Sequence, residues 1–288
     1  MANLKGGTFD KQLKDAFHRL EAFGKGRHGN SDHLTHSDGL ASKREMYLND
    51  YKEFAQENGM NEKLNQTMTD ANINTFLNQR LEGLKHSTQE NYIRGFSSML
   101  KGLQESNIKI DCQSSVFDNK VAEVKAMALP DTRTGLAIAN PSEKIEQLQS
   151  IRFESAVLAE VQNDLGVRVS EAFEVVKNLD AHYNTANGMI ENLTGKGNHT
   201  YEPKMISSEL VEKIRACENV PCQNTYRNDL KAVEIEKSHH WRYTAAKAAF
   251  EKRIEAGVEY RQSLREVSEG LNHSLKRESM TLFYLSRA

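Results

Sequence analysis

The sequence is poor in the residues and runs that define several classes of protein. Its 288 residues include three cysteines, Cys112, Cys217 and Cys222, a sparse and odd set that argues against a disulfide scaffold and fits a reducing compartment. Only four prolines occur, which favours long helices. There is no apolar run of about 18 residues and no apolar N-terminal stretch, which argues against a membrane span and a secretory signal. These absences predict a helical protein of the cytoplasm.

The chain also lacks an excess of either charge. Lys and Arg number 38, Asp and Glu number 40, and the formal net charge is −2. A protein that relies on nonspecific attraction to nucleic acid is usually strongly basic. Basic and acidic residues are balanced on both sides of Ser115, so neither half is basic overall. Any DNA-binding surface must therefore gather basic residues on one side, with a modest nonspecific affinity that falls steeply with salt.

Apolar residues at helical spacing dominate the N-terminal half. The pattern predicts four helices within residues 1–107, with a polar loop over residues 24–39 after the first. The fourth helix is expected to begin at a capping box, because Ser87 is followed three residues later by Glu90. A further helix is predicted over residues 119–129.

The best candidate for a domain boundary is the stretch LPDTRTGLAIANPS at 129–142, which has Pro130 and Pro141 near its two ends. It is rich in turn formers and has few residues suited to a core. We therefore expect an N-terminal helical domain over residues 1–115, a linker region over residues 116–141 and a C-terminal domain over residues 142–288.

The C-terminal half is also mostly helical. One helix is predicted over residues 142–161, and residues 188–206 are predicted to form two short strands around the turn GKGN. The expected fold class is mainly α with a small β-sheet. Further helices are predicted near residues 207–218, 225–236, 239–256, 260–271 and 275–286.

Basic and hydroxyl-bearing residues recur in this half in five short segments. The segments are GVRVSE at 166–171, TGKGN at 194–198, HHWR at 239–242, LNH at 271–273 and FYL at 283–285. Each alone is a weak signal. Together and in this order they resemble the active-site segments of the tyrosine recombinases, the family of phage integrases and Xer-type recombinases. In the N-terminal half, STQENYIRGFSSMLKGL resembles the family's core-binding helix.

The resemblance implies a helical core-binding domain and a catalytic domain that cuts and rejoins double-stranded DNA without a cofactor or a metal. It also implies a 3′-phosphotyrosyl link, a Holliday-junction intermediate and a homotetramer on two attachment sites. We interpret the protein as an integrase of a phage or other mobile element, acting at the nucleoid with directionality or host accessory proteins as further partners. The matched residues are Arg168, Lys196, His239, Arg242, His273 and Tyr284, supported by Glu171.

The charged residues and the tyrosine among these suit phosphodiester chemistry. The guanidinium groups of Arg168 and Arg242 can neutralise two non-bridging oxygens as a pentacovalent transition state forms. Tyr284 can attack phosphorus. The leaving 5′ oxygen needs a proton, for which Lys196 in a hairpin turn is suitable.

The remaining residues have supporting roles. His239 is expected to accept the proton of the nucleophile, and His273 to hydrogen-bond a non-bridging oxygen. Glu171 is expected to orient a neighbouring cationic or imidazole group. The candidates for DNA binding in the N-terminal domain are Lys85, Arg94 and Lys101.

Three nearby residues are given structural roles. His240 is assigned to a partly exposed helix surface, because its spacing to Arg242 is two residues rather than three. Trp241, the only tryptophan, is expected to anchor a core. Tyr260 precedes His273 and is therefore out of order for the nucleophile.

The sequence departs from the family pattern at two positions and at its end. Asn272 stands where the family usually has Gly, and Tyr243 where it often has His. Four residues follow Tyr284, whereas family members often continue with a helix that docks on a neighbouring subunit. Two other functions therefore stay open: a catalytically inactive DNA-binding accessory protein of the same fold, and a type IB topoisomerase-like enzyme that relaxes DNA. The separate helical N-terminal domain favours the recombinase.

Two other clusters are interpreted without a ligand. His28, His33 and His36 have irregular spacing and no nearby cysteine, which is typical of a solvated loop rather than a metal site. Cys217 and Cys222 lack the second pair that a zinc module needs. The basic residues near the N-terminus, which either contact phosphates or form a solvated face, are Lys5, Lys11, Lys14 and Lys25.

Overall fold

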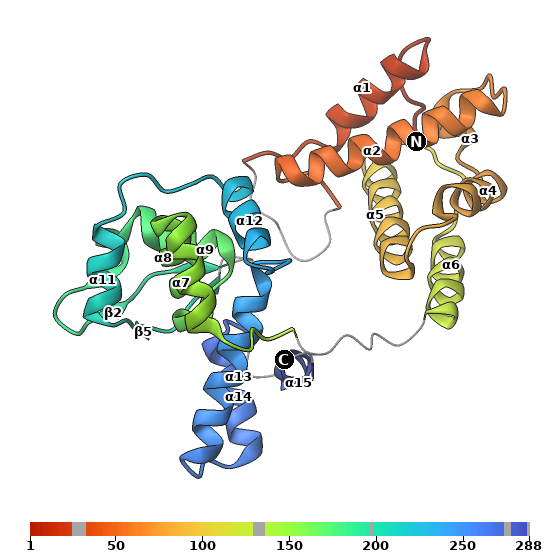
Figure 1. Cartoon of the computed structure of the whole chain (residues 1–288). Coiled ribbons are helices and arrows are strands. Elements are labelled where there is room, and N and C mark those ends of the chain that lie inside the picture. The colour runs from red at the N-terminus through yellow and green to blue at the C-terminus, as the bar shows by residue number, and fades with distance from the viewer. Residues whose placement is uncertain (25–32, 129–135, 196–198, 274–277, 287–288) are drawn as a thin grey trace. The chain divides into compact units, whose positions relative to one another are not determined.

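The computed structural model describes residues 1–24, 33–128, 136–195, 199–273 and 278–286 (Figure 1). The chain divides into two compact units, Met1–Pro130 and Asp131–Ala288. The predicted fold class is confirmed, because the described residues are mainly helical and the second unit carries small antiparallel sheets. Across these ranges, no helix combines the length and the apolar character needed to cross a membrane.

The described part of the first unit consists of six helices. Four of them are the long helices predicted within residues 1–107, and α3 was not predicted because four residues are too few for a periodic pattern. The helices are α1 (Phe9–Leu20), α2 (Asp38–Glu57), α3 (Leu64–Thr67), α4 (Asp70–Leu81), α5 (His86–Glu105) and α6 (Ser114–Met127).

An aromatic cluster holds helices α2, α4 and α5 together. The ring of Phe76 lies edge to face with that of Tyr51, with centroids 5.1 Å apart, and 5.2 Å from the ring of Phe96. Close approach of α2 and α5 requires a glycine, because a Cβ at Gly95 would lie 2.1 Å from the hydroxyl of Tyr47. The core of the unit is thus built from the apolar faces that the sequence pattern predicted.

Helix α6 belongs to the first unit, although residues from 116 onward were assigned to the linker region. Its buried residues Phe117, Val121 and Val124 form one stripe that faces the first core. The ring of Phe117 lies 6.2 Å from that of Phe96. The first unit therefore extends past residue 115, because the sequence-based division followed the prolines and overlooked this apolar stripe.

The predicted capping box at the start of α5 was wrong. The N-cap is Lys85, so Ser87 lies inside the first turn and does not cap the helix. Glu90 instead pairs with Arg94, at 2.9 Å. Gln89 in the first turn donates hydrogen bonds to the carbonyls of residues 81 and 84 at the end of α4, and this contact fixes where α5 begins.

The polar stretch over residues 24–39 is anchored at its described end. The buried side chain of Arg44 donates hydrogen bonds to Oγ1 of Thr35 and to the carbonyl of His33. The described end of this loop is therefore held against α2, in contrast to the solvated loop expected. His28 lies outside the described residues.

The sheets of the second unit are antiparallel and short. Strands β1 (Tyr183–Asn184), β2 (Met189–Ile190) and β5 (Lys204–Met205) form one sheet in the order β1-β2-β5, with Ile190 opposite both Tyr183 and Lys204. Strands β3 (Thr194–Gly195) and β4 (His199–Thr200) form a separate pair. The predicted pair of strands around GKGN is therefore present as β3 and β4, with further pairing on either side.

The described residues of the second unit also form nine helices. The helix predicted over residues 142–161 is two helices, because Arg152 is extended and its Nε bonds Oδ2 of Asp229 at 3.0 Å. Helices α9 and α10 were not predicted. The helices are α7 (Pro141–Ile151), α8 (Phe153–Leu165), α9 (Val169–Lys177), α10 (Leu179–His182), α11 (Ser208–Arg215), α12 (Gln223–Ala232), α13 (His239–Glu255), α14 (Tyr260–Gly270) and α15 (Glu278–Leu285).

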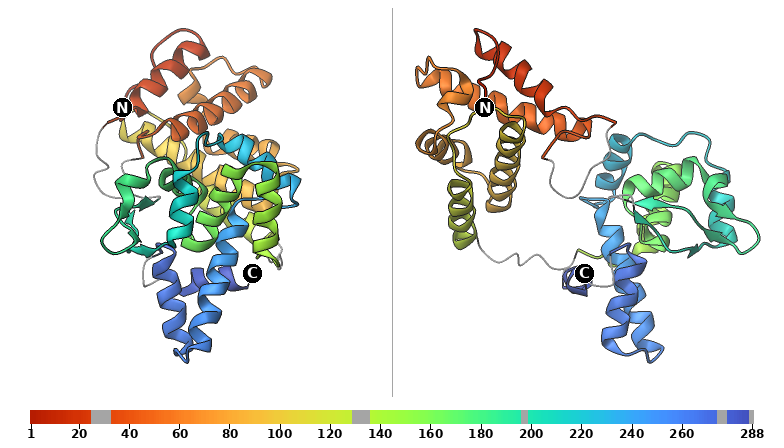
Figure 2. Two further views of the ribbon diagram at one scale, coloured as in Figure 1. Left: turned by 60° about the vertical axis from the view of Figure 1, so that its left-hand side comes forward. Right: turned by 180° about the vertical axis from the view of Figure 1, so that it is seen from behind.

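Two features of this unit position the predicted site. Helix α8 ends at Gly166 in the left-handed conformation, φ +62°, and the chain then turns so that Arg168 is the N-cap of α9. Trp241 is fully buried in the second core, as predicted, and fixes the first turn of α13. Helices α13 and α14 pack side by side in both views of Figure 2, and Tyr284 of α15 is buried in the same cluster as Tyr243.

Candidate active site

The hydroxyl of Tyr284 lies between two of the other predicted site residues. The tyrosine is 3% exposed and is carried by α15. Its Oη lies 2.9 Å from Nε2 of His239 and accepts a hydrogen bond from Nε of Arg242 at 3.3 Å. His239 and Arg242 are one turn apart at the start of α13 and therefore face the same side of the helix.

Arg242 is fully buried, and each of its five N–H groups has a partner. Besides Tyr284, its Nη1 donates to the carbonyl of Gly166 at 2.7 Å and to Oη of Tyr201 at 3.1 Å. Its Nη2 donates to the carbonyl of Leu271 and lies 3.4 Å from Nε2 of His273. One guanidinium group thus joins three of the other four matched segments, at residues 166–171, 271–273 and 283–285.

Arg168 and Glu171 form the second half of the cluster. Nη1 of Arg168 donates to Oε1 of Glu171 at 3.1 Å and to Oη of Tyr201 at 3.2 Å, and the side chain of Arg168 is 24% exposed. The backbone N–H of Arg168 donates to Oε2 of Glu171 at 2.6 Å, as does the hydroxyl of Tyr201 at 2.6 Å. Glu171 therefore fixes both a cationic group and a phenol.

The hydroxyl of Tyr201 connects the two arginines. It donates to Glu171 and accepts from both Arg168 and Arg242. Burial raises the pKa of Tyr201 to about 12, although the positive charge of Arg242 acts in the opposite direction. Burial alone would raise the pKa of Glu171, but the hydrogen bonds from Tyr201 and Arg168 lower it. The carboxylate is charged near neutral pH and the phenol is protonated.

His239 is held in its neutral form. Burial, and then the positive charges of Arg242 and Arg168, lower the pKa of His239 to about 4. The imidazole is therefore an acceptor at neutral pH. Its ring lies 5.6 Å from the ring of Tyr284 and 5.3 Å from that of Tyr243.

This shift predicts how the stability of the second unit depends on pH. An unfolded chain binds a proton on His239 below about pH 6.5, whereas the folded unit binds it only near pH 4. The contribution is full above pH 6.5 and is lost as the pH falls toward 4. We expect the wild type to lose more stability between pH 7 and pH 4.5 than His239→Asn does, in urea titrations followed by the fluorescence of Trp241. His199→Asn, at an exposed ring, should keep the wild-type slope, and equal slopes for wild type and His239→Asn would contradict the shift.

Lys196 lies outside the described residues, but the residues on either side of it contact the site. A Cβ at Gly195 would lie 2.8 Å from Oε1 of Glu171 and 2.9 Å from Nδ2 of Asn272, so only glycine fits there. On the other strand, the carbonyl of His199 accepts a hydrogen bond from Nδ2 of Asn272 at 2.8 Å. The hairpin of β3 and β4 is thus fixed against the site.

The backbone conformation of Asn272 explains how asparagine can stand where the family usually has glycine. It follows the C-terminal end of α14 in the left-handed conformation, φ +54°, which glycine adopts most easily and asparagine next. Its backbone N–H donates to the carbonyl of Glu269, and the N–H of His273 donates to that of Ser268. Asparagine keeps the turn that delivers His273 to Arg242 and adds a side-chain bond to β4.

Two residues of the cluster were not predicted, Tyr201 and Lys204. Nζ of Lys204 donates to the carbonyl of Gly270 at 2.6 Å and lies 5.5 Å from the ring centre of Tyr201. Burial, and then the positive charges of Arg242 and Arg253, lower the pKa of Lys204 to about 8. The strands around these residues are two residues long, so their alternation was too brief to indicate which side chains face inward.

The residues given structural roles lie apart from these hydrogen bonds. His240 is half-buried and its ring lies 6.4 Å from that of Tyr243. Tyr243 packs on Tyr284, with ring centres 4.9 Å apart. Tyr260 is 54% exposed and contacts Phe250 instead.

The other residues singled out in the sequence are exposed or half-buried, or lie outside the described residues. Lys85, Arg94 and Lys101 are exposed, with Arg94 and Lys101 on one face of α5. Cys217 is half-buried and Cys222 exposed, both as free thiols. Within the described ranges, no group of three His, Cys, Asp or Glu side chains is placed to hold a metal ion. Of the N-terminal lysines, Lys5, Lys11 and Lys14 are exposed, and Lys25 lies outside the described residues.

The position of Tyr201 predicts a double effect of Tyr201→Phe. Loss of the hydroxyl leaves Glu171, Arg168 and Arg242 each short of one partner, which we expect to cost about 1–3 kcal/mol of unfolding free energy. It should also slow any DNA cleavage, because the spacing of the two guanidinium groups is no longer fixed. Urea titration by Trp241 fluorescence and a cleavage assay measure the two effects. Tyr183→Phe, at a half-buried tyrosine of β1, is the control, and matching behaviour of the two variants would contradict the role of Tyr201.

The fold and the cluster around Tyr284 define a class: the chain has the fold of the tyrosine recombinases. No family model and no curated protein sequence matches the chain. Solved structures do match it. The XerH site-specific recombinase, in a pre-cleavage complex with its difH substrate, superposes with a TM-score of 0.56 at 16% identity over 84% of this chain and 75% of the XerH chain.

Two integrases match to a similar extent. A lambda integrase dimer bound to a COC′ core site gives a TM-score of 0.57 at 15% identity, over 87% of this chain and 72% of that one. The integrase of transposon Tn1549, in complex with a circular intermediate DNA, gives 0.55 at 12% identity over 97% and 93%. At these identities the likeness establishes the fold.

Proposed function

We propose that the protein is a site-specific DNA recombinase that cleaves and rejoins DNA through a covalent bond to Tyr284. One observation carries the proposal. The hydroxyl of Tyr284 lies 2.9 Å from a neutral imidazole that can accept its proton and 3.3 Å from a guanidinium N–H that stabilises the phenolate. Such an arrangement makes a buried tyrosine nucleophilic.

In the proposed cleavage step, Oη of Tyr284 forms a bond to the phosphorus of the scissile phosphodiester. Its proton passes to Nε2 of His239. The bond from phosphorus to the 5′ oxygen breaks, and that oxygen takes a proton, for which Lys196 remains the predicted donor. The negative charge of the phosphate offsets the two arginines that lower the pKa of His239, so the imidazole becomes a stronger base when DNA is in place. Rejoining is the reverse, with a 5′ hydroxyl as the nucleophile and no energy source.

The arginines supply the positive charge that the transition state needs. Arg168 is the more accessible of the two, and a cavity of about 510 Å³ is lined by Arg168, Glu171 and Gly195. Arg242 already has five partners, so a phosphate oxygen binds it by replacing one of them. Tyr284 is a partner that can leave without unfolding the second core, whereas the carbonyls of Gly166 and Leu271 belong to the helix ends that carry the site. We therefore expect α15 to shift as the phosphate enters.

The partners we propose are double-stranded attachment sites, bound by a homotetramer, in a mobile element or phage whose direction is set by accessory proteins. The fold neighbours support DNA as the partner, because XerH, lambda integrase and the Tn1549 integrase are each in complex with DNA. A helical first unit, separate from the catalytic unit, agrees with this arrangement. We place the activity in the cytoplasm at the nucleoid.

Covalent trapping tests the proposal. Duplexes that tile the DNA flanking the gene are nicked at random with a brief DNase I treatment, incubated with the protein in EDTA, and denatured in SDS. A nick next to the scissile phosphate lets the cleaved fragment diffuse away and leaves protein attached to DNA. We expect an SDS-resistant adduct, and sequencing of the attached strand gives the site. If no duplex gives an adduct although the protein still binds DNA, the result would instead support an inactive accessory protein. If every duplex gives an adduct and the protein also relaxes supercoiled plasmid, the result would support a topoisomerase.

A further inference from the structure

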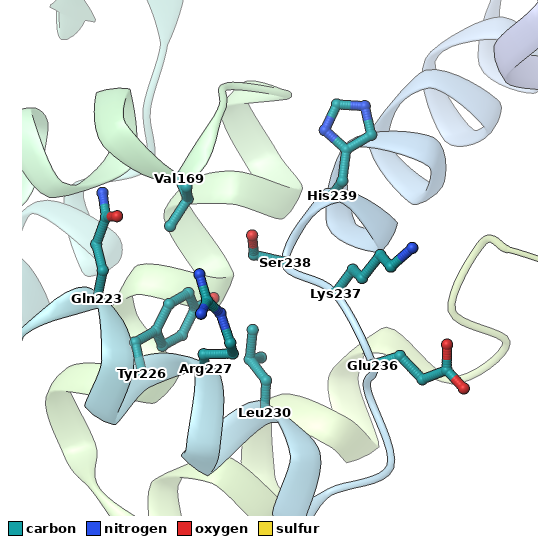
Figure 3. Close-up of a pocket in the computed structure, with 9 residues that line it drawn as sticks. All are labelled: Val169, Gln223, Tyr226, Arg227, Leu230, Glu236, Lys237, Ser238 and His239. Atoms are coloured by element: carbon teal, nitrogen blue, oxygen red, sulfur yellow. The ribbon is translucent and has the colours of Figure 1, made fainter. Parts of the chain in front are cut away.

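A second cavity of about 180 Å³ opens beside His239 (Figure 3). Its walls come from α12, from the segment that leads into α13, and from Val169, the residue after Arg168. The phenol of Tyr226 lines it and is satisfied, because its hydroxyl donates to Gln162 at 2.9 Å. The cavity is therefore next to the catalytic cluster on two sides, yet no residue of that cluster except His239 lines it.

Arg227 has an unusual position on this wall. It is exposed, and in the described parts of the chain it is the one arginine without a hydrogen bond or an ion pair. Figure 3 shows its guanidinium group directed toward the centre of the cavity. A guanidinium group presents up to five donors in a planar fork, which suits the oxygens of a phosphate.

Two further side chains offer donors to the same space. Ser238 is the N-cap residue of α13, but its backbone is helical, φ −56° and ψ −23°, and its hydroxyl does not cap the helix. Figure 3 shows the side chain of Ser238 extending from its backbone to the side on which Arg227 lies. The amide of Gln223, at the first turn of α12, also lines the cavity and has no partner among the described residues. These three polar side chains thus line one small volume, and none of them has a hydrogen-bond partner among the described residues.

The charge of the cavity wall favours an anion. Glu236 and Lys237 offset each other, and Figure 3 shows both side chains directed away from Arg227. The charge of Arg227 is therefore uncompensated inside the cavity. His239 belongs to the proposed site of the scissile phosphate, and Val169 directly follows Arg168 of that site. The position of the cavity therefore suits the next phosphate along the DNA strand.

We infer that this cavity is a subsite for the backbone phosphate next to the scissile phosphate, with Arg227 as its charged ligand and Ser238 and Gln223 as hydrogen-bond donors. The inference rests on the proposed function, since it takes DNA as the substrate. Its role is to hold the strand in register, so that the scissile phosphate lies opposite Tyr284. Contacts of this kind position DNA and carry no sequence information.

The test combines protein and DNA substitutions. Gel shift measures the DNA affinities of the wild type, Arg227→Ala and Arg215→Ala on the DNA site identified by covalent trapping. In a series of such duplexes, one neutral methylphosphonate replaces one phosphate at a time, at each of the three phosphates on either side of the scissile phosphate. Arg215 is a matched control, since it is exposed on α11 and pairs with Glu212. We expect Arg227→Ala to bind about 10-fold more weakly, with a salt slope lower by about 1. One adjacent methylphosphonate should weaken the wild type equally and leave Arg227→Ala unchanged.

The subsite would be overturned if the affinity losses from Arg227→Ala and from the methylphosphonate add at every phosphate position. It would also be overturned if Arg227→Ala binds DNA with the affinity and the salt slope of the wild type. Unchanged fluorescence of Trp241 verifies folding of the variant, which is expected because Arg227 has no hydrogen bond or ion pair with any described residue. The wild-type adduct on unmodified DNA separates the two hypotheses. Where the wild type forms it and the substitutions are additive, the subsite alone is wrong. Where the wild type neither binds nor forms an adduct, the proposed function fails as well.

Discussion

Tyr284→Phe is expected to abolish the covalent adduct with nicked DNA, a loss of at least about 10⁴-fold in cleavage. The phenylalanine keeps the ring contacts with His239, Tyr243 and His273, which lie 4.9–5.7 Å away between centres. What it removes is the oxygen that becomes bonded to phosphorus. Arg242 Nε loses one acceptor, which we expect to cost no more than about 1–2 kcal/mol of stability. DNA affinity should be retained, so gel shift and adduct formation separate binding from chemistry.

Tyr260→Phe is the matched control for this variant. Tyr260 is the exposed tyrosine of α14 and contacts only Phe250 among its ring neighbours, so its variant should form the adduct at the wild-type rate. An adduct that persists in Tyr284→Phe would remove Tyr284 as the nucleophile. Loss of the adduct in Tyr260→Phe with retention in Tyr284→Phe would transfer the role to Tyr260.

The order of the motifs predicted the cluster better than local patterns predicted the fold around it. Arg168, His239, Arg242, His273 and Tyr284 come from four separate segments, and the structure brings all five within one hydrogen-bonded group. The cluster could be predicted from the sequence because the proposed chemistry requires each residue type and because each residue lies near a helix end or turn with a recognisable sequence. The catalytic roles themselves stay predictions.

The wrong predictions have a common physical cause, because contacts between residues far apart in the sequence determine where the short elements begin and end. Nothing in the sequence near Arg152 marks a helix break, since the break depends on its contact with Asp229, far along the chain. Ser87 has the right partner three residues on, but the contact of Gln89 with the end of α4 sets the helix start. Tyr201 faces the arginines because the hairpin of β3 and β4 is held against Asn272, through the close approach of Gly195 and the hydrogen bond to the carbonyl of His199.

Tyr201 and Lys204 also show what a motif cannot contain. A motif names groups that contact the substrate, whereas these two residues hold the groups that are predicted to do so. Tyr201 fixes the spacing of Arg168 and Arg242, and Lys204 holds the carbonyl of Gly270, one residue before the carbonyl of Leu271 that accepts from Arg242. Because such supports are specific to one packing arrangement, neither spacing nor residue type indicates them in advance.

Arg242→Lys is expected to reduce cleavage by at least about 10²–10³-fold at pH 7, although the positive charge is kept. Lysine offers three donors from one point and cannot reach the five partners that surround the guanidinium group. The carbonyls of Gly166 and Leu271 would then compete with the phosphate for the same ammonium group, so the charge is no longer aimed at the transition state. Single-turnover cleavage of the trapped site gives the rate, and urea titration by Trp241 fluorescence gives the accompanying loss of stability.

Arg253→Lys is the control, because Arg253 lies on the same helix and pairs with Glu266 at the surface. We expect it to cleave at the wild-type rate. Arg168→Lys separates a catalytic loss from a folding defect, since Arg168 is partly exposed and its substitution should slow cleavage with a smaller cost in stability than Arg242→Lys. If folded Arg242→Lys cleaves DNA at the wild-type rate, the proposed binding of the phosphate by Arg242 is contradicted. That binding is also our explanation of why one buried guanidinium group holds the ends of α8 and α14 next to Tyr284.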